Sequence, residues 1–203
     1  MIAFKCPAGS RSSFLLLMAL WFGASAGRAQ SGLQRLDEHI LEGLAAGRTD
    51  GQTRVWRMVS DANNYVNAGI PIGVLVDGII RNDEPTKRNG LYMTVSVATT
   101  YLLNLAIKRL VKRPRPFLTD SRLAPVYRPR EYSFPSGHTS SAFSVVTSLS
   151  RCYPKWYVVA PSFLWAAGVG YSRMYLGVHY PTDVTGGAVL GAGTAFAWGF
   201  LRR

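Results

Sequence analysis

The sequence LYMTVSVATTYLLNLAI, residues 91–107, contains no charged side chain. A helix that spans a bilayer needs roughly 17 to 25 predominantly apolar residues, and this stretch just reaches that length. Similar stretches occupy residues 65–80, 156–172 and 184–201, and a fifth, uncharged but rich in Ser and Thr, covers 137–150. The pattern predicts an all-α fold, a helical bundle with five transmembrane spans, although the buried helices of a soluble bundle have a similar pattern.

The charges between these stretches favour one orientation in the membrane. If every stretch crosses, the loops on one side are residues 81–90, 151–155 and the tail 202–203, and all three are basic. Cytoplasmic loops carry an excess of Lys and Arg, so this side is predicted to be the inner one. The outer loops are then 108–136 and 173–183. The first of these is also basic, which the rule does not predict.

Two details fit helices that pack against each other in lipid. Gly187 and Gly191 have the small-xxx-small spacing that lets two helix backbones approach closely. Pro71 and Asp77 interrupt the stretch 65–80, so that stretch is expected to need protein neighbours rather than lipid alone.

Residues 1–29 are typical of an export signal. Lys5 and Arg11 precede a short apolar run, FLLLMALWF at 14–22, and small residues follow it. An uncleaved N-terminal anchor is the alternative, and it would raise the number of spans from five to six. Both interpretations place the next segment on the far side of the membrane.

Residues 30–64 are predicted to be an amphipathic helical segment that packs on the main domain, residues 65–203. Apolar side chains recur there at spacings of three and four, at Leu33, Leu36, Ile40 and Leu44. A break at 47–51 separates this helix from a second, short one. Helices lying in the membrane interface are the alternative interpretation.

The composition combines 48% hydrophobic residues with a formal net charge of +12. Such a charge favours negatively charged partners: nucleic acid, anionic lipid or a phosphorylated substrate. The apolar stretches make nucleic acid the least favoured of these, so no nucleic-acid partner is expected. Cys152 is the only cysteine after the export signal, so no intramolecular disulfide is expected.

Three short motifs contain the residues suited to binding and catalysis, and the predicted topology brings all three to the outer surface. Lys108, Arg115 and Arg173 are cations that need an anion between them if they lie close together, and phosphate oxygens match the guanidinium fork. Ser136 and Gly137 begin a predicted helix, whose first N–H groups can donate to the same anion.

The same motifs supply candidates for the catalytic groups. His179 is the predicted nucleophile, with Asp183 four residues later to orient its ring, and His138 is the predicted general acid. Pro181 argues against a helix through this segment and predicts a turn that leads into the last helix. Asp183 is the only carboxylate in the three motifs, too little for a magnesium site, so neither a metal nor another cofactor is expected.

These motifs resemble those of the type-2 phosphatidic acid phosphatase and vanadium haloperoxidase superfamily. The similarity lies in KRLVKRPRP at 108–116, PSGH at 135–138 and SRMYLGVHYPTD at 172–183, and covers about residues 65–201. It implies that Lys108, Arg115 and Arg173 bind phosphate with help from Ser136 and Gly137. It also implies that His138 is the acid, and that His179, oriented by Asp183, becomes a phosphohistidine.

The resemblance implies a metal-independent phosphatase of lipid phosphates, such as phosphatidic acid, phosphatidylglycerol phosphate, undecaprenyl pyrophosphate or lipid A. Its expected location is a bacterial-type inner membrane, with the site on the periplasmic face. The short loop of 18 residues between Pro116 and Pro135 favours a compact lipid phosphatase over a haloperoxidase. The remaining alternatives are a soluble periplasmic acid phosphatase and a non-catalytic membrane protein that binds anionic lipids. The sequence predicts no particular oligomeric state.

Overall fold

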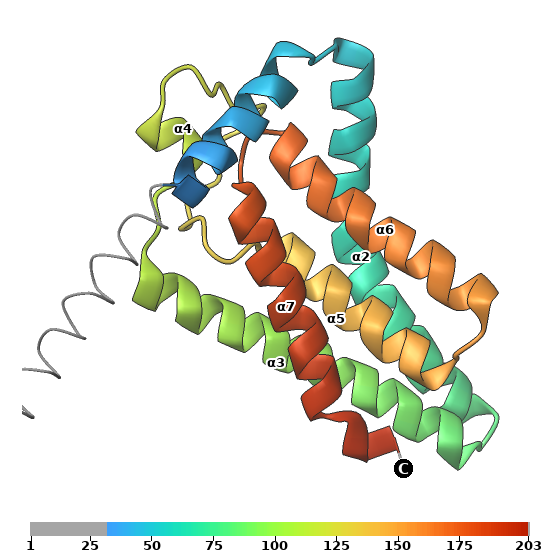
Figure 1. The fold of residues 1–203 in the computed structure, drawn as a ribbon. Coiled ribbons are helices and arrows are strands. Elements are labelled where there is room, and N and C mark those ends of the chain that lie inside the picture. Colours follow the sequence, from blue (N-terminus) through green and yellow to red (C-terminus); the bar gives the residue numbers. More distant parts are fainter. Residues whose placement is uncertain (1–31, 203) are drawn as a thin grey trace, which may run out of the picture. The chain divides into compact units, whose positions relative to one another are not determined.

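The computed structural model describes residues 32–202, and every regular element in that range is a helix (Figure 1). The all-α prediction is thereby confirmed. The chain divides into a short N-terminal unit that ends at Asp37 and a main unit, Glu38–Arg203, which contains everything discussed below. The predicted export signal, residues 1–29, lies outside the described residues.

Five long helices form the main unit, together with two short ones. Residues 32–46 are also helical and precede them. The elements are, in order, α2 (Asp50–Ile80), α3 (Glu84–Val111), α4 (Pro116–Thr119), α5 (Gly137–Cys152), α6 (Trp156–Tyr175), α7 (Pro181–Ala197) and the 3₁₀ helix η1 (Gly199–Arg202).

Two details of the expected N-terminal segment differ in the structure. The short helix expected after the break at 47–51 is the start of α2, which continues through Pro71 to Ile80 and crosses the expected boundary at residue 64. Thr49 caps α2 by accepting a hydrogen bond from the Gln52 amide. In the preceding helix the buried apolar side chain is Leu41, which packs with Leu123 and Tyr180. Ile40 and Leu44, the members of the predicted stripe that lie within the main unit, are only partly buried. The division into a segment 30–64 and a domain 65–203 stays a prediction.

Helix α5 lies at the centre of the bundle and contacts α2, α3, α6 and α7 (Figure 1). It is also the stretch with the most Ser and Thr, and several of these hydroxyls are buried: Thr139, Ser140, Ser144, Thr147 and Ser148. The Ser148 hydroxyl, for example, donates to the Ser144 carbonyl oxygen at 2.7 Å. A central helix is covered by protein on all sides, which explains how the least apolar stretch can be the most enclosed.

Close backbone contact joins α5 to α7, as the glycine spacing predicted. A Cβ atom on Gly187 would lie 2.7 Å from the Ser136 carbonyl oxygen, and one on Gly191 would lie 2.0 Å from that of Ser140. Real Cβ contacts essentially never fall below 3.0 Å, so only glycine fits at either position. The prediction of a close helix–helix approach is confirmed. This contact between α5 and α7 begins at the first residues of α5, which belong to the PSGH motif.

The outward faces of the long helices carry many large apolar side chains. Leu110 on α3 is 81% exposed, Leu164 on α6 is 73% exposed and Val189 on α7 is 70% exposed. A polar centre with an apolar exterior is the arrangement expected of helices surrounded by lipid. By length and composition, one described stretch, Glu84–Thr119, is apolar and long enough to cross a membrane. The count of five spans stays a prediction.

The two ends of the bundle differ in the motifs that they carry (Figure 1). The α2–α3 turn, the α5–α6 turn and η1 lie together at one end, where the Arg202 guanidinium donates to the Arg151 carbonyl oxygen. The end of α3 and the starts of α5 and α7 lie at the other end. All three motifs are thus brought to the end opposite the basic turns.

Candidate active site

Short backbone contacts tie the three motifs together. The Ser136 amide donates to the Asp183 carbonyl oxygen at 3.0 Å, which joins the start of α5 to the start of α7. The Ser133 amide donates to the Arg113 carbonyl oxygen at 2.9 Å, which joins the loop before α5 to the loop after α3. The three motifs are therefore held together in space, although they are far apart in the sequence.

The link between α6 and α7 presents His179. Gly177 has a φ of +71°, a conformation that side-chain-bearing residues rarely adopt, and this turn directs the chain back toward the bundle. Pro181 is the first residue of α7, as predicted, so His179 lies in the turn before the helix and Asp183 in its first turn. Both side chains are almost completely buried.

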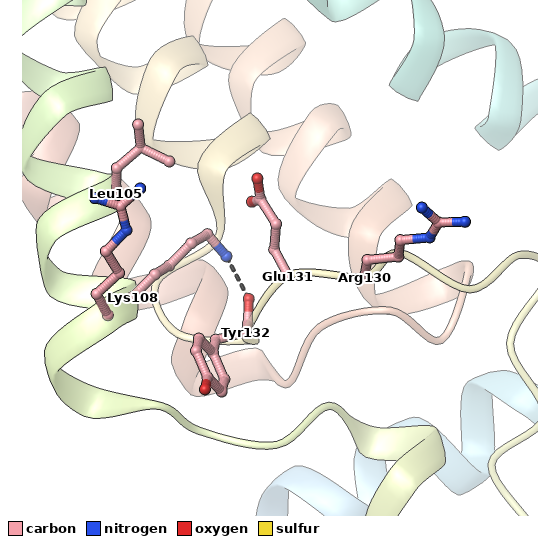
Figure 2. A pocket seen from close by; sticks show the side chains of 6 residues that line it. Leu105, Lys108, Arg130, Glu131 and Tyr132 are labelled. Carbon is pink, nitrogen blue, oxygen red and sulfur yellow. Dashed lines mark hydrogen bonds between the residues drawn. The ribbon is translucent and has the colours of Figure 1, made fainter.

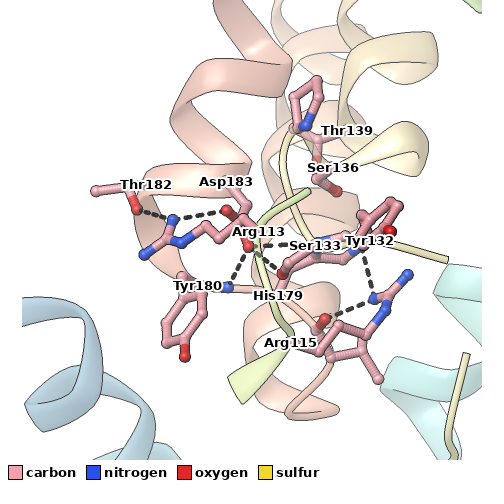
Figure 3. A network of polar contacts seen from close by, with 12 residues as sticks. Arg113, Arg115, Tyr132, Ser133, Ser136, Thr139, His179, Tyr180, Thr182 and Asp183 are labelled. Carbon is pink, nitrogen blue, oxygen red and sulfur yellow. Dashed lines mark hydrogen bonds and ion pairs between the residues drawn. The ribbon is translucent and has the colours of Figure 1, made fainter. Parts of the chain in front are cut away.

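Asp183 is held in place by three donors (Figure 3). Arg113 Nη1 donates to Oδ1 at 2.7 Å, while the Tyr180 amide donates to Oδ2 at 2.9 Å and the Ser133 hydroxyl donates to Oδ2 as well. The same Oδ2 lies 3.6 Å from Nδ1 of His179. The fixed carboxylate therefore faces one ring nitrogen only.

Arg115 occupies the other side of the histidine ring (Figure 3). Its Nη1 lies 3.3 Å from Nε2 of His179 and donates to the Val178 carbonyl oxygen at 2.7 Å. A guanidinium has no acceptor, so this contact requires Nε2 to be the unprotonated nitrogen and assigns the ring proton to Nδ1, facing Asp183. The lone pair of Nε2 thus points toward a buried cation.

The pKa values of this pair follow from burial and charge. Burial lowers the pKa of His179 to about 3, and the positive charges of Arg173 and Arg115 act in the same direction against the opposing effect of Asp183. Burial alone would raise the pKa of Asp183, but His179, Arg113 and Ser133 together lower it. At neutral pH the pair is therefore a neutral imidazole beside a carboxylate, the form that a nitrogen nucleophile needs.

The other two predicted phosphate ligands are also buried. Lys108 donates to the Tyr132 carbonyl oxygen, and Arg173 donates to the hydroxyl of Ser60 on α2. Nε of Arg173 is buried without a hydrogen-bond partner among the described residues. A buried, incompletely satisfied guanidinium is costly unless a ligand completes its bonds.

The PSGH motif lies where it was expected, at the start of α5. Ser136 is the N-cap residue, and its side chain accepts no capping bond from the helix but contacts the Thr139 hydroxyl at 2.8 Å. The first N–H groups of α5 are accordingly available to an anion. Gly137 and the half-buried His138 line a cavity of about 190 Å³ together with residues of α2, α3 and the loop before α5.

Two members of this network, Arg113 and Ser133, were not predicted from the sequence. Arg113 stands two residues before Arg115 in a basic run, and nothing in the run distinguishes the arginine that pairs with Asp183 from the one that faces His179. Ser133 lies in the irregular loop before PSGH. Within residues 32–202 no group of three or more His, Cys, Asp or Glu side chains is arranged to hold a metal ion.

Comparison with known proteins gives a consistent result. The sequence model of the PAP2 superfamily matches residues 89–202. The chain is 37% identical over 114 residues to phosphatidylglycerophosphatase B of Bacillus subtilis, covering 51% of this chain and 53% of that protein. It is 32% identical over 115 residues to an undecaprenyl-diphosphatase of Sulfolobus acidocaldarius, covering 55% of this chain and 54% of that protein. These matches span about half the length of each relative.

Among solved structures, the fold is similar to that of a transmembrane PAP2-type phosphatidylglycerolphosphate phosphatase from Bacillus subtilis. The TM-score is 0.73 at 27% sequence identity, and the superposition covers 92% of this chain and 94% of the other. The similarity therefore extends over nearly the whole helical bundle, including the segments outside residues 89–202.

Proposed function

The chain belongs to the PAP2 superfamily, and from this premise we propose that it removes phosphate from a lipid through a phosphohistidine on His179. The observation that carries the proposal is the setting of this ring, with Nδ1 facing Asp183 and Nε2 facing Arg115 in a buried site. The named relatives, a phosphatidylglycerophosphatase and an undecaprenyl-diphosphatase, support a lipid phosphate as the substrate class.

The proposed first step is transfer of the phosphoryl group to the enzyme. The phosphate oxygens are bound by Lys108, Arg115 and Arg173, whose positive charge stabilises the negative charge of the transition state. Nε2 of His179 forms a bond to phosphorus as the bond from phosphorus to the lipid oxygen breaks. His138 gives a proton to that oxygen and so releases the lipid alcohol or lipid phosphate.

The second step is hydrolysis of the phosphohistidine. Neutral His138 takes a proton from a water molecule as its oxygen attacks phosphorus, and the bond between phosphorus and Nε2 breaks. Inorganic phosphate leaves, and the ring returns to its starting tautomer because Asp183 keeps the proton on Nδ1. The cationic side chains that bind the phosphate supply the charge stabilisation that a divalent metal ion supplies in metal-dependent phosphatases. This supports a metal-independent reaction.

A membrane location with the site on the outer, periplasmic face is also part of the proposal. The apolar exterior of the helices supports the location, and the basic turns at the end opposite the site support the orientation. Attachment of a cysteine-reactive, membrane-impermeant label to a single cysteine introduced at exposed Ser121 tests the orientation in intact cells. If the introduced cysteine is labelled only after the membrane is permeabilised, the site faces the cytoplasm and the proposed orientation is wrong.

The direct test is release of inorganic phosphate by the detergent-purified protein in the presence of EDTA. The substrates are phosphatidic acid, phosphatidylglycerol phosphate, undecaprenyl pyrophosphate, lipid A and a soluble phosphomonoester. Release from a lipid that disappears in His179→Ala is the expected result, together with an acid-labile, alkali-stable phosphoenzyme in the parent protein. Preference for the soluble ester, or release that EDTA abolishes, would contradict the proposal.

A further inference from the structure

A second cavity lies beside the proposed phosphate site, and of its lining residues only Lys108 has a role in the mechanism above. It has a volume of about 420 Å³ and lies between the last turns of α3 and the loop that precedes α5 (Figure 2). The residues that line it are Leu105, Lys108, Arg109, Arg130, Glu131 and Tyr132. Arg109 lies within the first motif, KRLVKRPRP at 108–116, but neither Arg109 nor Arg130 has a role in the proposed mechanism.

The lining of this cavity is strongly positive. Its lining contains three cations, Lys108, Arg109 and Arg130, and one carboxylate, that of Glu131, which lies between Lys108 and Arg130 in Figure 2. In the described part of the chain neither Arg109 nor Arg130 has a hydrogen bond or ion pair with another side chain. An open cavity with unpaired guanidinium groups and a surplus of positive charge is suited to an anion, and phosphate oxygens match the guanidinium fork.

Shared residues connect this cavity with the proposed reaction site. Lys108 lines the cavity and is also a proposed ligand of the transferred phosphate. Leu105 and Glu131 line the cavity and also line the smaller one that contains His138. The cavity therefore adjoins the smaller cavity that contains His138.

We propose that this cavity binds a second phosphate, carried by the leaving group of the substrate, and that Arg109 and Arg130 select lipid diphosphates over lipid monophosphates. This proposal rests on the proposed function. The bond that breaks joins the transferred phosphorus to the bridging oxygen, which takes a proton from His138 and leaves as part of a lipid monophosphate. Lys108 lines this cavity and is also a proposed ligand of the transferred phosphate, so it would contact both phosphates.

The test compares two substrates that differ only in the second phosphate, farnesyl diphosphate and farnesyl monophosphate. Inorganic phosphate release gives kcat and KM for the parent protein and for the double variant Arg109→Gln/Arg130→Gln. The charge-matched control is Arg54→Gln/Arg122→Gln, which removes two exposed arginines that do not line the cavity. A third variant, Arg109→Lys/Arg130→Lys, keeps the charge and removes the planar fork.

The expected result is a loss of about tenfold in kcat/KM for the diphosphate in the double glutamine variant, mostly through KM, because the contact exists before and during the reaction. Activity on the monophosphate stays within about twofold and shows that the variant is folded. The lysine variant retains part of the preference. Equal losses on both substrates, no loss on either, or the same loss in the control would overturn the proposal. Absence of activity on any lipid phosphate in the parent protein would instead overturn the proposed function.

Discussion

Replacement of Gly191 by alanine tests whether the backbone contact between α5 and α7 sets the geometry of the site. The new Cβ would lie 2.0 Å from the Ser140 carbonyl oxygen and 2.8 Å from the Ser144 amide nitrogen. Both are backbone atoms of α5, so no side-chain rotation relieves the overlap. Since real Cβ contacts essentially never fall below 3.0 Å, the two helices must separate locally by at least about 1 Å.

The size of the effect follows from what that separation does to stability and to the site. Overpacking of a close contact costs about 1–3 kcal/mol of unfolding free energy. The bond from the Ser136 amide to the Asp183 carbonyl oxygen, now 3.0 Å, lies along the same interface and would exceed hydrogen-bond range if lengthened by a comparable amount. A displacement of about 1 Å at the start of α7 is expected to lower kcat/KM about 100-fold.

Gly193 provides a matched control on the same helix. A Cβ at this position meets no atom within 4 Å, so Gly193→Ala is expected to raise the unfolding free energy by roughly 0.5–1 kcal/mol through the better helix propensity of alanine. The measurements are thermal unfolding in detergent and phosphate release from a lipid substrate. If Gly191→Ala is as stable and as active as Gly193→Ala, the contact does not control the site and the reasoning is wrong.

Three further predictions concern the site itself. Arg113→Gln removes the partner of Asp183 Oδ1 and should lower kcat about 10- to 100-fold with little change in KM. Arg113→Lys should retain part of the kcat that Arg113→Gln loses. A change in KM alone would contradict the positioning role of Arg113. Gly177→Ala places a Cβ at a φ of +71° and 2.7 Å from Arg48 Nη2, so thermal unfolding should show a loss of about 1–2 kcal/mol, and unchanged stability would show that the turn is not strained. The pKa of His179 in the folded protein, about 3, lies below its ordinary value of 6.5. Between these two pH values the unfolded chain binds more protons than the folded one. The free energy of unfolding therefore falls as the pH falls, by at most about 1.4 kcal/mol per pH unit. His179→Gln lacks this titration and should lose less stability than the parent protein on acidification from about pH 6.5 to about 4.5, as thermal unfolding in detergent would show; an equal loss would refute the assignment.

The sequence allowed the helical stretches to be predicted because their boundaries are marked by charges, glycines and prolines. The stretches at 91–107 and 156–172 lie wholly within α3 and α6. The continuity of α2 across residues 60–64 was not predicted, because the sequence SDANN there is polar and resembles a break between two helices. In the structure Ser60 and Asn63 are buried and bond to neighbours distant in the sequence. Thr53, near the start of α2, likewise contacts the Tyr175 hydroxyl at 3.3 Å.

The candidate site was predictable only where a residue's chemistry and spacing were unusual. His179 and Asp183 stand four residues apart around a proline, and the structure places them side by side. Arg113 and Arg115, in contrast, are chemically identical and two residues apart, and only the path of the irregular loop after α3 decides which faces the histidine. The cavity lined by Arg109 and Arg130 requires the loop before α5 to fold against α3, a contact that no sequence periodicity encodes.

The polar centre of the bundle also explains what fixes the orientation of the start of α5. Asparagines of α2 and α3 donate to it from two sides: Asn67 to the Ser141 hydroxyl at 2.7 Å, Asn104 to the Ser140 hydroxyl at 3.2 Å and Asn63 to the His138 carbonyl oxygen at 3.3 Å. Apolar packing alone would let a helix of small side chains rotate at little cost, whereas hydrogen bonds are directional. These bonds, with the glycine contact to α7, fix the rotation of α5. The orientation of the first N–H groups of α5 and of the His138 backbone is thereby fixed.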